Sequence, residues 1–170
     1  KYGDQTVLEQ KDITQILLKQ GEIGGKVSAF SINPIDWKLM TGSIRFLLPI
    51  KFPSVPCFDI AGVVSDENGN TNFKKGDRVF AKLNNLSGGA ASTDIVLDAK
   101  VASKIPDGLS FEEAASIPLA SLTALQGLRD YGAMKMQDAN CRVLVVGASG
   151  GVGLFATQIA AHAGAHVTAV

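Results

Sequence analysis

A glycine-rich turn near the end of the chain is the part of this sequence best suited to chemistry. Gly147, Gly150 and Gly153 are each separated by two residues, and they follow the apolar run VLVV at 143–146. Glycine permits backbone angles and close approaches that a Cβ would block. A turn of this kind that opens a helix leaves free amide N–H groups, and it directs the positive end of the helix dipole at one place. The spacing therefore predicts an anion-binding site.

The elements around this turn predict a strand, a helix and a second strand. Residues 143–146 are apolar without alternation, as expected for a parallel strand covered on both faces. Apolar residues then recur at helical spacing, namely Val152, Phe155, Ala156, Ile159, Ala160 and Ala163. Gly164 is placed to end the helix, and residues 165–170 are expected to form the second strand. In such a unit the predicted anion is a dinucleotide pyrophosphate, and the alternative is a tight strand-to-helix connection without a ligand.

The same segment contains no Asp, Glu, Lys or Arg from residue 143 to residue 170, and its length would suit a membrane span. Four glycines and a serine stand near its middle, however, and a buried β-α-β unit explains the missing charges equally well. We therefore predict no membrane span.

Composition sets broad limits on the class of protein. The 170 residues allow one domain or two small ones, and 46% hydrophobic with 19% charged residues is typical of a globular chain. Sixteen basic and sixteen acidic residues give no general attraction to nucleic acid. Cys57 and Cys141 have no metal-ligand spacing, so we expect buried or half-buried thiols in a reducing, intracellular compartment.

The first hundred residues predict a compact β domain, a partly open barrel. Strands are expected at 7–9, 26–32, 59–64 and 95–97, a turn followed by a strand at 73–81, and further turns at Gly21, Gly24 and Gly25. Asp36 is expected to cap a short helix at 37–40. Three prolines in 47–56 predict an irregular loop, whereas residues 13–18 are compatible with either helix or strand.

Two helices are expected before the glycine turn. Ser110 and Glu113 form a capping-box pattern for a helix that ends near Pro118, and residues 119–128 have helical spacing up to Tyr131 and Gly132. A polar segment at 135–140 then leads to the strand. The predicted divisions are a β domain at 1–105, connecting helices at 106–140 and the β-α-β unit at 141–170.

Several of these blocks occur together in one known family. They are NPIDWK at 33–38, GVV at 62–64, FKKGDRV at 73–79, AASIP at 114–118, LTAL at 122–125 and GASGGVG at 147–153. In this order they resemble the medium-chain dehydrogenase/reductase superfamily, and within it the zinc-independent quinone oxidoreductase group. Residues 33–58 are most similar to the plant chloroplast-envelope members of that group.

The resemblance implies a GroES-like catalytic domain followed by the start of a Rossmann domain that binds NADPH. It implies hydride transfer to small lipophilic quinones or α,β-unsaturated carbonyl compounds. It also allows a homodimer, and a location in the cytoplasm or in a plastid. The implied cofactor-binding residues are Asn33, Thr123, Ala148, Ser149, Gly150, Gly151, Val152 and Gly153. The Ser149–Val152 amides are expected to face the pyrophosphate, and Gly153 to allow close helix packing. Asn33 could instead be a turn residue, and Thr123 an ordinary helix threonine.

The zinc branch of the superfamily does not match. Asn33 and Asp36 stand where that branch has a cysteine and an aspartate, and Phe58-Asp59 replaces its His-Glu pair. The four-cysteine structural lobe is missing too, so we expect no metal. Met40 and Ile44 occupy positions where bacterial quinone reductases carry Arg and Tyr, which favours a more lipophilic substrate. No residue is assigned as the catalytic acid.

The family's Rossmann domain continues past the position of Val170, and the residue that distinguishes NADPH from NADH would follow there. We therefore expect a fragment or short form that binds cofactor poorly by itself. The alternative to an oxidoreductase is a non-catalytic binding or structural protein on the same fold.

Overall fold

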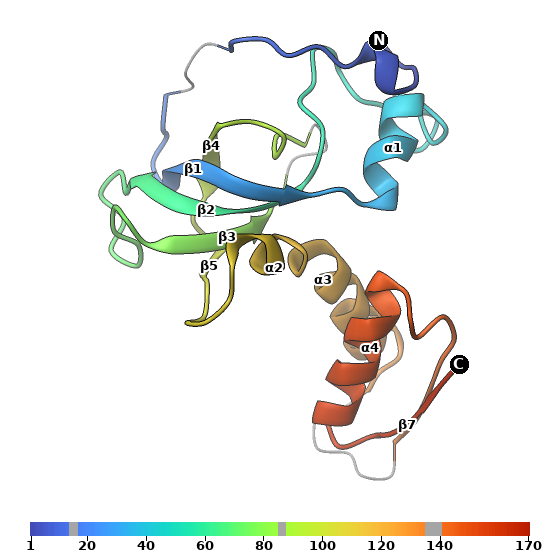
Figure 1. Ribbon diagram of the computed structural model, residues 1–170. Helices are drawn as coiled ribbons and strands as arrows, with labels where there is room; N and C mark the ends of the chain where they lie inside the picture. The colour runs from blue at the N-terminus through green and yellow to red at the C-terminus, as the bar shows by residue number, and fades with distance from the viewer. Residues whose placement is uncertain (14–16, 85–87, 135–140) are drawn as a thin grey trace. The chain divides into compact units, whose positions relative to one another are not determined.

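The computed structural model of the chain describes residues 1–13, 17–84, 88–134 and 141–170 (Figure 1). The chain divides into two compact units, Lys1–Ser116 and Ile117–Val170. The finer division into three segments stays a prediction.

The first unit is built on one antiparallel sheet of five strands in the order β4-β1-β2-β3-β5 (Figure 1). The strands are β1 (Glu22–Ser31), β2 (Asp59–Asp66), β3 (Arg78–Lys82), β4 (Asp94–Asp98) and β5 (Ala102–Lys104). Buried side chains from four of them form the core, among them Ile23, Ile60, Val64, Val79 and Leu97. The predicted β-rich first part is thus confirmed, although β5 was not predicted.

The close approach of β1 and β2 depends on glycine. A Cβ at Gly62 would overlap the carbonyl oxygen of Lys26 on β1. The predicted turns at Gly24 and Gly25 are wrong, because both lie inside β1. A Cβ at Gly24 would stand 3.1 Å from the Ser65 hydroxyl oxygen, so these glycines serve strand packing.

Helix α2 (Phe111–Ala115) packs against this sheet and starts as predicted. The Ser110 hydroxyl accepts from the amide of Glu113 at 3.1 Å, and the Glu113 carboxylate accepts from the amide of Ser110 at 2.8 Å. Ala114 and Ala115 then join Ala61 in a small buried cluster. The capping box predicted from the sequence is confirmed.

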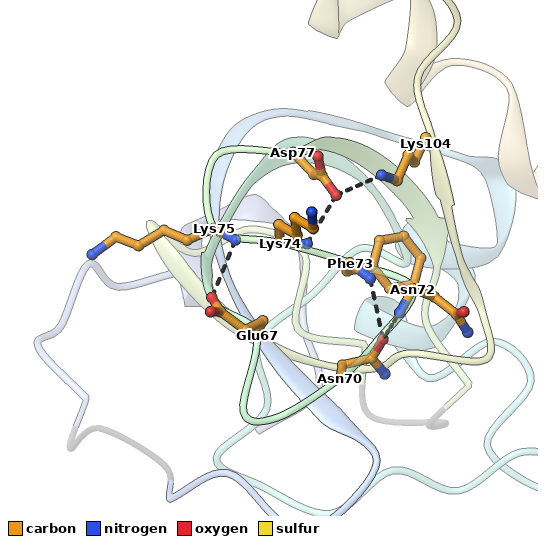
Figure 2. Close-up of polar contacts among 8 residues, drawn as sticks. All are labelled: Glu67, Asn70, Asn72, Phe73, Lys74, Lys75, Asp77 and Lys104. Atoms are coloured by element: carbon orange, nitrogen blue, oxygen red, sulfur yellow. Dashed lines mark hydrogen bonds and ion pairs between the residues drawn. The ribbon is translucent and has the colours of Figure 1, made fainter.

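The turn between β2 and β3 is held by side chains that accept hydrogen bonds from its own backbone (Figure 2). Asn70 Oδ1 accepts from the amides of residues 72 and 73, and Glu67 Oε2 accepts from the amide of Lys75. Asp77 Oδ2 accepts from the amide of Lys74 at 2.9 Å and pairs with Lys104 Nζ at 2.8 Å. The polar residues of this turn therefore have a structural role.

The N-terminal segment and helix α1 (Pro34–Thr41) correct two predictions. The strand expected at 7–9 is wrong, because residues Gln5–Val7 form a 3-10 helix that Asp4 caps through the amide of Thr6. Asp36 is not the N-cap of α1 either. The helix starts earlier, with Asn33 as N-cap and Asp36 in its first turn, since Pro34 suits a first helical position.

The second unit contains α3 (Pro118–Gln126), a π-helical turn η2 (Gly127–Tyr131), and then β6 (Arg142–Val145), α4 (Gly151–His162) and β7 (His166–Ala169). Strands β6 and β7 pair in parallel, which confirms the β-α-β unit. Helices α3 and α4 pack on each other (Figure 1). The predicted segment at 135–140 lies outside the described residues.

Strand β6 differs from its prediction in one respect. Val145 is buried, but Leu144 is 64% exposed and the following Val146 is 78% exposed. The strand is therefore covered on one face, not on both. In the described part of the chain, no helix has the length and apolar character needed to cross a membrane.

Candidate cofactor-binding site

Backbone hydrogen bonds fix the glycine turn between β6 and α4. The amides of Gly147 and Ala148 donate to the carbonyl oxygen of Val170 at 2.8 and 3.0 Å, and the amide of Gly150 donates to the carbonyl oxygen of Gly147 at 3.0 Å. Gly147 has a φ of 77°, a conformation that side chains with a Cβ rarely adopt. The start of α4 is thus set by the end of the strand pair.

Gly153 and Gly151 have different surroundings. A Cβ at Gly153 would overlap the carbonyl oxygen of Gly147 and stand 2.8 Å from the Cα of Ala148. A Cβ at Gly151 would meet nothing within 4 Å. Gly153 therefore packs α4 against the turn, whereas Gly151 stands in open space at the helix start.

The first turn of α4 offers unused hydrogen-bond donors. Its N-cap is Gly150, which supplies no side-chain cap, and no acidic residue lies in the first turn. Among the described residues, no carbonyl accepts from the amides of Gly151 or Val152. Of the four amides predicted to face an anion, that of Gly150 is instead engaged by Gly147. The remaining donors and the helix dipole suit an anionic group.

A cleft of about 530 Å³ opens beside this helix start. It lies wholly in the second unit, and Thr123 on α3 lines it together with the glycine turn. The lining residues comprise Thr123, Ala124, Gly127, Leu128, Val143 to Gly147, Gly150 to Gly153 and Ala156. Its volume is in the range of small-molecule sites. Thr123 has the only polar side chain among these lining residues.

The structure brings five of the eight predicted cofactor residues to this cleft: Thr123, Gly150, Gly151, Val152 and Gly153. Ala148 and Ser149 belong to the turn but are not among the lining residues. The Thr123 hydroxyl donates to the carbonyl oxygen of Leu119 at 2.7 Å, as in an ordinary helix threonine. Asn33 lies in the other unit, at the N-terminus of α1.

Around Asn33 the first unit holds a cluster of polar side chains, which we call the Asp59 cluster: Ser31, Asn33, Asp36 and Asp59. Asn33 Nδ2 donates to Asp59 Oδ2 at 2.9 Å and to Ser31 Oγ at 3.1 Å, and Ser31 Oγ donates to Asp59 Oδ2 at 3.0 Å. The amide N–H of Asn33 donates to Asp36 Oδ2 at 2.6 Å. The two carboxyl groups are the only buried charged side chains among the described residues, with Asp59 fully enclosed.

The carboxyl groups of this cluster affect the ionisation of their neighbours. Burial raises the pKa of Asp36; the hydrogen bond from the Asn33 amide opposes this shift, and the charge of Asp59 adds to it. Burial also raises the pKa of the Cys57 thiol to about 12, with contributions from Asp36 and Asp59. Both cysteines are free, as expected for a reduced protein, and Cys57 is buried.

Sequence reasoning did not identify Ser31 and Asp59 as site residues. One feature of the sequence could have pointed to Asp59, because it is a charged residue at the start of the apolar strand β2. Aspartates are rarely buried unless they are paired, so a partner for Asp59 could have been expected. Within the described ranges, no group of three or more His, Cys, Asp or Glu side chains is arranged to hold a metal ion.

Known proteins support the fold. Residues 19–107 match the alcohol dehydrogenase GroES-like domain. The chain is 42% identical to the chloroplast envelope quinone oxidoreductase homolog of Arabidopsis thaliana, over 98% of this chain and 52% of the relative. The chain therefore spans about half the length of that relative.

Solved structures agree with the sequence comparison. Escherichia coli quinone oxidoreductase, solved with NADPH, superposes with a TM-score of 0.79 at 32% identity and covers 99% of this chain and 50% of its own. The CurK enoyl reductase superposes with a TM-score of 0.82 at 28% identity, over 99% of this chain and 51% of its own. The predicted fold, a GroES-like part followed by a Rossmann β-α-β unit, is confirmed.

Proposed function

Since the chain belongs to the alcohol dehydrogenase GroES-like family, in the quinone oxidoreductase group of the medium-chain dehydrogenase/reductases, we propose that it forms part of an NADPH-dependent oxidoreductase. The proposed reaction is the two-electron reduction of a lipophilic quinone, or of the C=C bond of an α,β-unsaturated carbonyl compound. It proceeds by hydride transfer and uses no zinc.

The observation that carries this proposal is the cleft beside the start of α4. Amides of Gly151 and Val152 accompany the positive end of a helix dipole, and Thr123 lines the same cleft. This arrangement suits a diphosphate joined to a largely apolar ligand. Similar structures solved with NADPH, among them the Escherichia coli quinone oxidoreductase, support NADPH as the proposed cofactor.

The residues of the chain have distinct proposed roles. The amides at the start of α4 and the preceding turn hold the pyrophosphate, while Thr123 contacts the nicotinamide end. The contact of Asn33 with the cofactor stays a prediction from the resemblance. Bound NADPH would supply the hydride, which goes to the quinone or to the electron-poor β-carbon of an enone, and solvent supplies the proton. Met40 and Ile44 provide apolar surface for the substrate.

The names of known proteins suggest substrate and compartment. One structural neighbour is an enoyl reductase, which supports the enone alternative. Two further relatives, from Spinacia oleracea and Triphysaria versicolor, are named as chloroplast proteins. We therefore favour a plastid over the cytoplasm. The homodimer stays a prediction.

The test is NADPH oxidation by the native polypeptide that carries this chain, with a panel of quinones and enones.

Gly151→Asp is the informative variant for the binding site, because an acidic residue in the first turn stabilises a helix but repels a pyrophosphate. Gly151→Asn is the matched neutral control. We expect the aspartate variant to keep its thermal stability and to bind NADPH at least tenfold more weakly than the control.

Two results would contradict the proposal. Equal NADPH affinity in both variants would show that the anion does not bind at the start of α4. Absence of NADPH oxidation with every quinone and enone would favour a non-catalytic binding or structural protein on this fold.

A further inference from the structure

The segment between β1 and β2 carries exposed aromatic side chains, each with a basic residue beside it in the sequence. The three pairs are Trp37 with Lys38, Arg45 with Phe46, and Lys51 with Phe52. All three aromatic residues are exposed, and Phe46 is 92% exposed. The guanidinium carbon of Arg45 lies 5.2 Å from the centre of the Phe46 ring. Two of the pairs belong to the loop that follows α1, residues 42–52, which we call the Phe46 loop (Figure 1).

This segment is positively charged, although the whole chain is neutral. Between Asp36 and Asp59 the sequence has three basic residues, Lys38, Arg45 and Lys51, and no acidic residue. Both aspartates are buried, whereas Arg45 and Lys51 are exposed. Among the described residues, no ion pair involves any of these three cations. The Phe46 loop therefore presents an uncompensated positive charge to its surroundings.

Backbone hydrogen bonds fix the turn that holds Phe46. The amides of Leu47 and Leu48 both donate to the carbonyl oxygen of Ile44 at 2.9 Å, and the amide of Arg45 donates to the carbonyl oxygen of residue 42 at 3.1 Å. Leu47 is itself 79% exposed. The two apolar side chains thus project from a hydrogen-bonded turn, not from an unpaired segment.

Tyr2 ties both ends of the Phe46 loop to the first unit. Its hydroxyl accepts from the amide of Ile50 at 3.1 Å, and its ring meets the Phe52 ring edge-on at 4.9 Å. A Cβ at Gly42 would stand 3.0 Å from the same Tyr2 ring, so the start of the loop also lies against it. The loop is therefore organised before it meets any partner.

The shape and charge of this loop favour a lipid surface over a protein partner. Side chains that dominate protein–protein binding lie in packed patches, where they fill pockets. A bilayer can receive projecting side chains such as Phe46 and Leu47 without a complementary pocket, because their apolar groups enter the boundary between headgroups and acyl chains. Arg and Lys residues beside them are attracted to anionic lipids.

We propose that the Phe46 loop docks the protein on an anionic membrane surface, with Phe46 and Leu47 inserted among the lipids and Arg45 and Lys51 at the lipid phosphates. Binding of this kind is peripheral and reversible, because few apolar side chains are inserted. The inference goes beyond the oxidoreductase proposal and does not depend on it.

The first test is cosedimentation of the native polypeptide that carries this chain with vesicles of phosphatidylcholine, alone or mixed with phosphatidylglycerol. We expect about tenfold or tighter binding to the mixed vesicles, since each cation near an anionic surface contributes about fivefold. Salt at about 1 M shortens the screening length to about 3 Å and should remove this preference. Equal binding to both kinds of vesicle at low salt, or binding to neither, would overturn the proposal.

Phe46→Ser tests the apolar part of the contact. Loss of the inserted ring should weaken binding to the mixed vesicles about tenfold or more. Tyr131→Ser is the matched control, because Tyr131 is 89% exposed but lies in the second unit, where the nearby Arg129 is paired with Asp130. This control should bind as the wild type does. Equal effects of the two substitutions would overturn the assignment to the Phe46 loop.

Arg45→Gln tests the charged part. It should weaken binding to the mixed vesicles about fivefold and leave any binding to pure phosphatidylcholine unchanged. Arg129→Gln is the matched control, since that cation already has an acidic partner, and it should have no effect. Wild-type binding by Arg45→Gln would overturn the role of the cations.

The position of residue 46 is tested with Phe46→Trp, which keeps an aromatic side chain. Its added fluorescence should be quenched by brominated lipid in the mixed vesicles, whereas that of Tyr131→Trp should not. Absence of quenching at residue 46 would overturn the proposed insertion. Self-association without vesicles that Phe46→Ser abolishes, measured by sedimentation velocity, would instead assign the loop to a contact between protein chains and overturn the lipid proposal.

Discussion

The carbonyl oxygen of Gly147 and the Cα of Gly153 lie so close together that a Cβ at position 153 would overlap that oxygen. They are six positions apart in the sequence, with Gly147 in the turn and Gly153 in the first turn of α4. The contact is between two backbone segments, so neither can move away as a flexible side chain would. Packing of the backbone therefore requires a glycine at position 153, whether or not a ligand binds.

Gly153→Ala should therefore destabilise the second unit. The added methyl group must displace the backbone, and overpacking of this kind costs about 1–3 kcal/mol. Urea denaturation monitored by circular dichroism measures the change. Gly151→Ala is the matched control, since a Cβ there meets nothing within 4 Å. Equal stabilities of the two variants would show that the turn can relax around residue 153.

Asp36 should make the stability of the first unit fall as the pH rises. Its pKa is raised by burial and by the charge of Asp59, with an opposing hydrogen bond from the Asn33 amide. A carboxyl group with a raised folded-state pKa stabilises the fold below its unfolded pKa, near the ordinary 3.8, and this stabilisation is lost as the pH rises through the folded pKa. The titratable groups that face it are Asp59 and Cys57.

Comparison with Asp36→Asn isolates this effect from that of other groups. Carboxylates such as Asp77 and Asp94, whose pKa values are lowered by partners, act in the opposite direction. The difference in unfolding free energy between wild type and Asp36→Asn should therefore decline from pH 4 upward. A difference that grows with pH would mean that Asp36 is the ionised member of the pair.

Cys57 should be unreactive in the folded protein. Its thiol is buried and its pKa is raised to about 12, chiefly by burial. At pH 8 only about one thiol in ten thousand would be ionised, and the thiolate is the reactive form. A thiol reagent should modify Cys57 at a measurable rate only after denaturant is added, which mass spectrometry of the tryptic peptide would show. Rapid labelling of Cys57 in the native state would contradict its burial.

The parts of this fold that depend on neighbours in the sequence could be predicted, and the parts that depend on distant residues could not. The unit from β6 to β7 was predicted because its apolar run, glycines and helical spacing are all local. The Asp59 cluster was missed because Ser31 and Asn33 are 28 and 26 residues away from Asp59. Only the pairing of β1 with β2 brings them together.

The elements that cover each face of a strand, and the very short strands, were also hard to predict from the sequence. An apolar run such as 143–146 predicts burial, but it does not say which elements cover each face, and Leu144 is exposed. Strand β5 has only three residues and no alternation, so its pairing with β3 decides its structure. The role of Asn33 as a helix cap was obscured because Asp36 has the same capping tendency.

Ser110→Ala should lower the free energy of unfolding of the first unit by about 1 kcal/mol. The Ser110 hydroxyl accepts from the amide of Glu113, and an alanine leaves that donor without its partner in the first turn of α2. Ser110→Gly is the matched control, because a glycine cap costs only about a few tenths of a kcal/mol. Chemical denaturation of both variants at one pH measures the difference. If the alanine variant were as stable as the glycine variant, then α2 would be held by the packing of Ala114 and Ala115 against Ala61 alone.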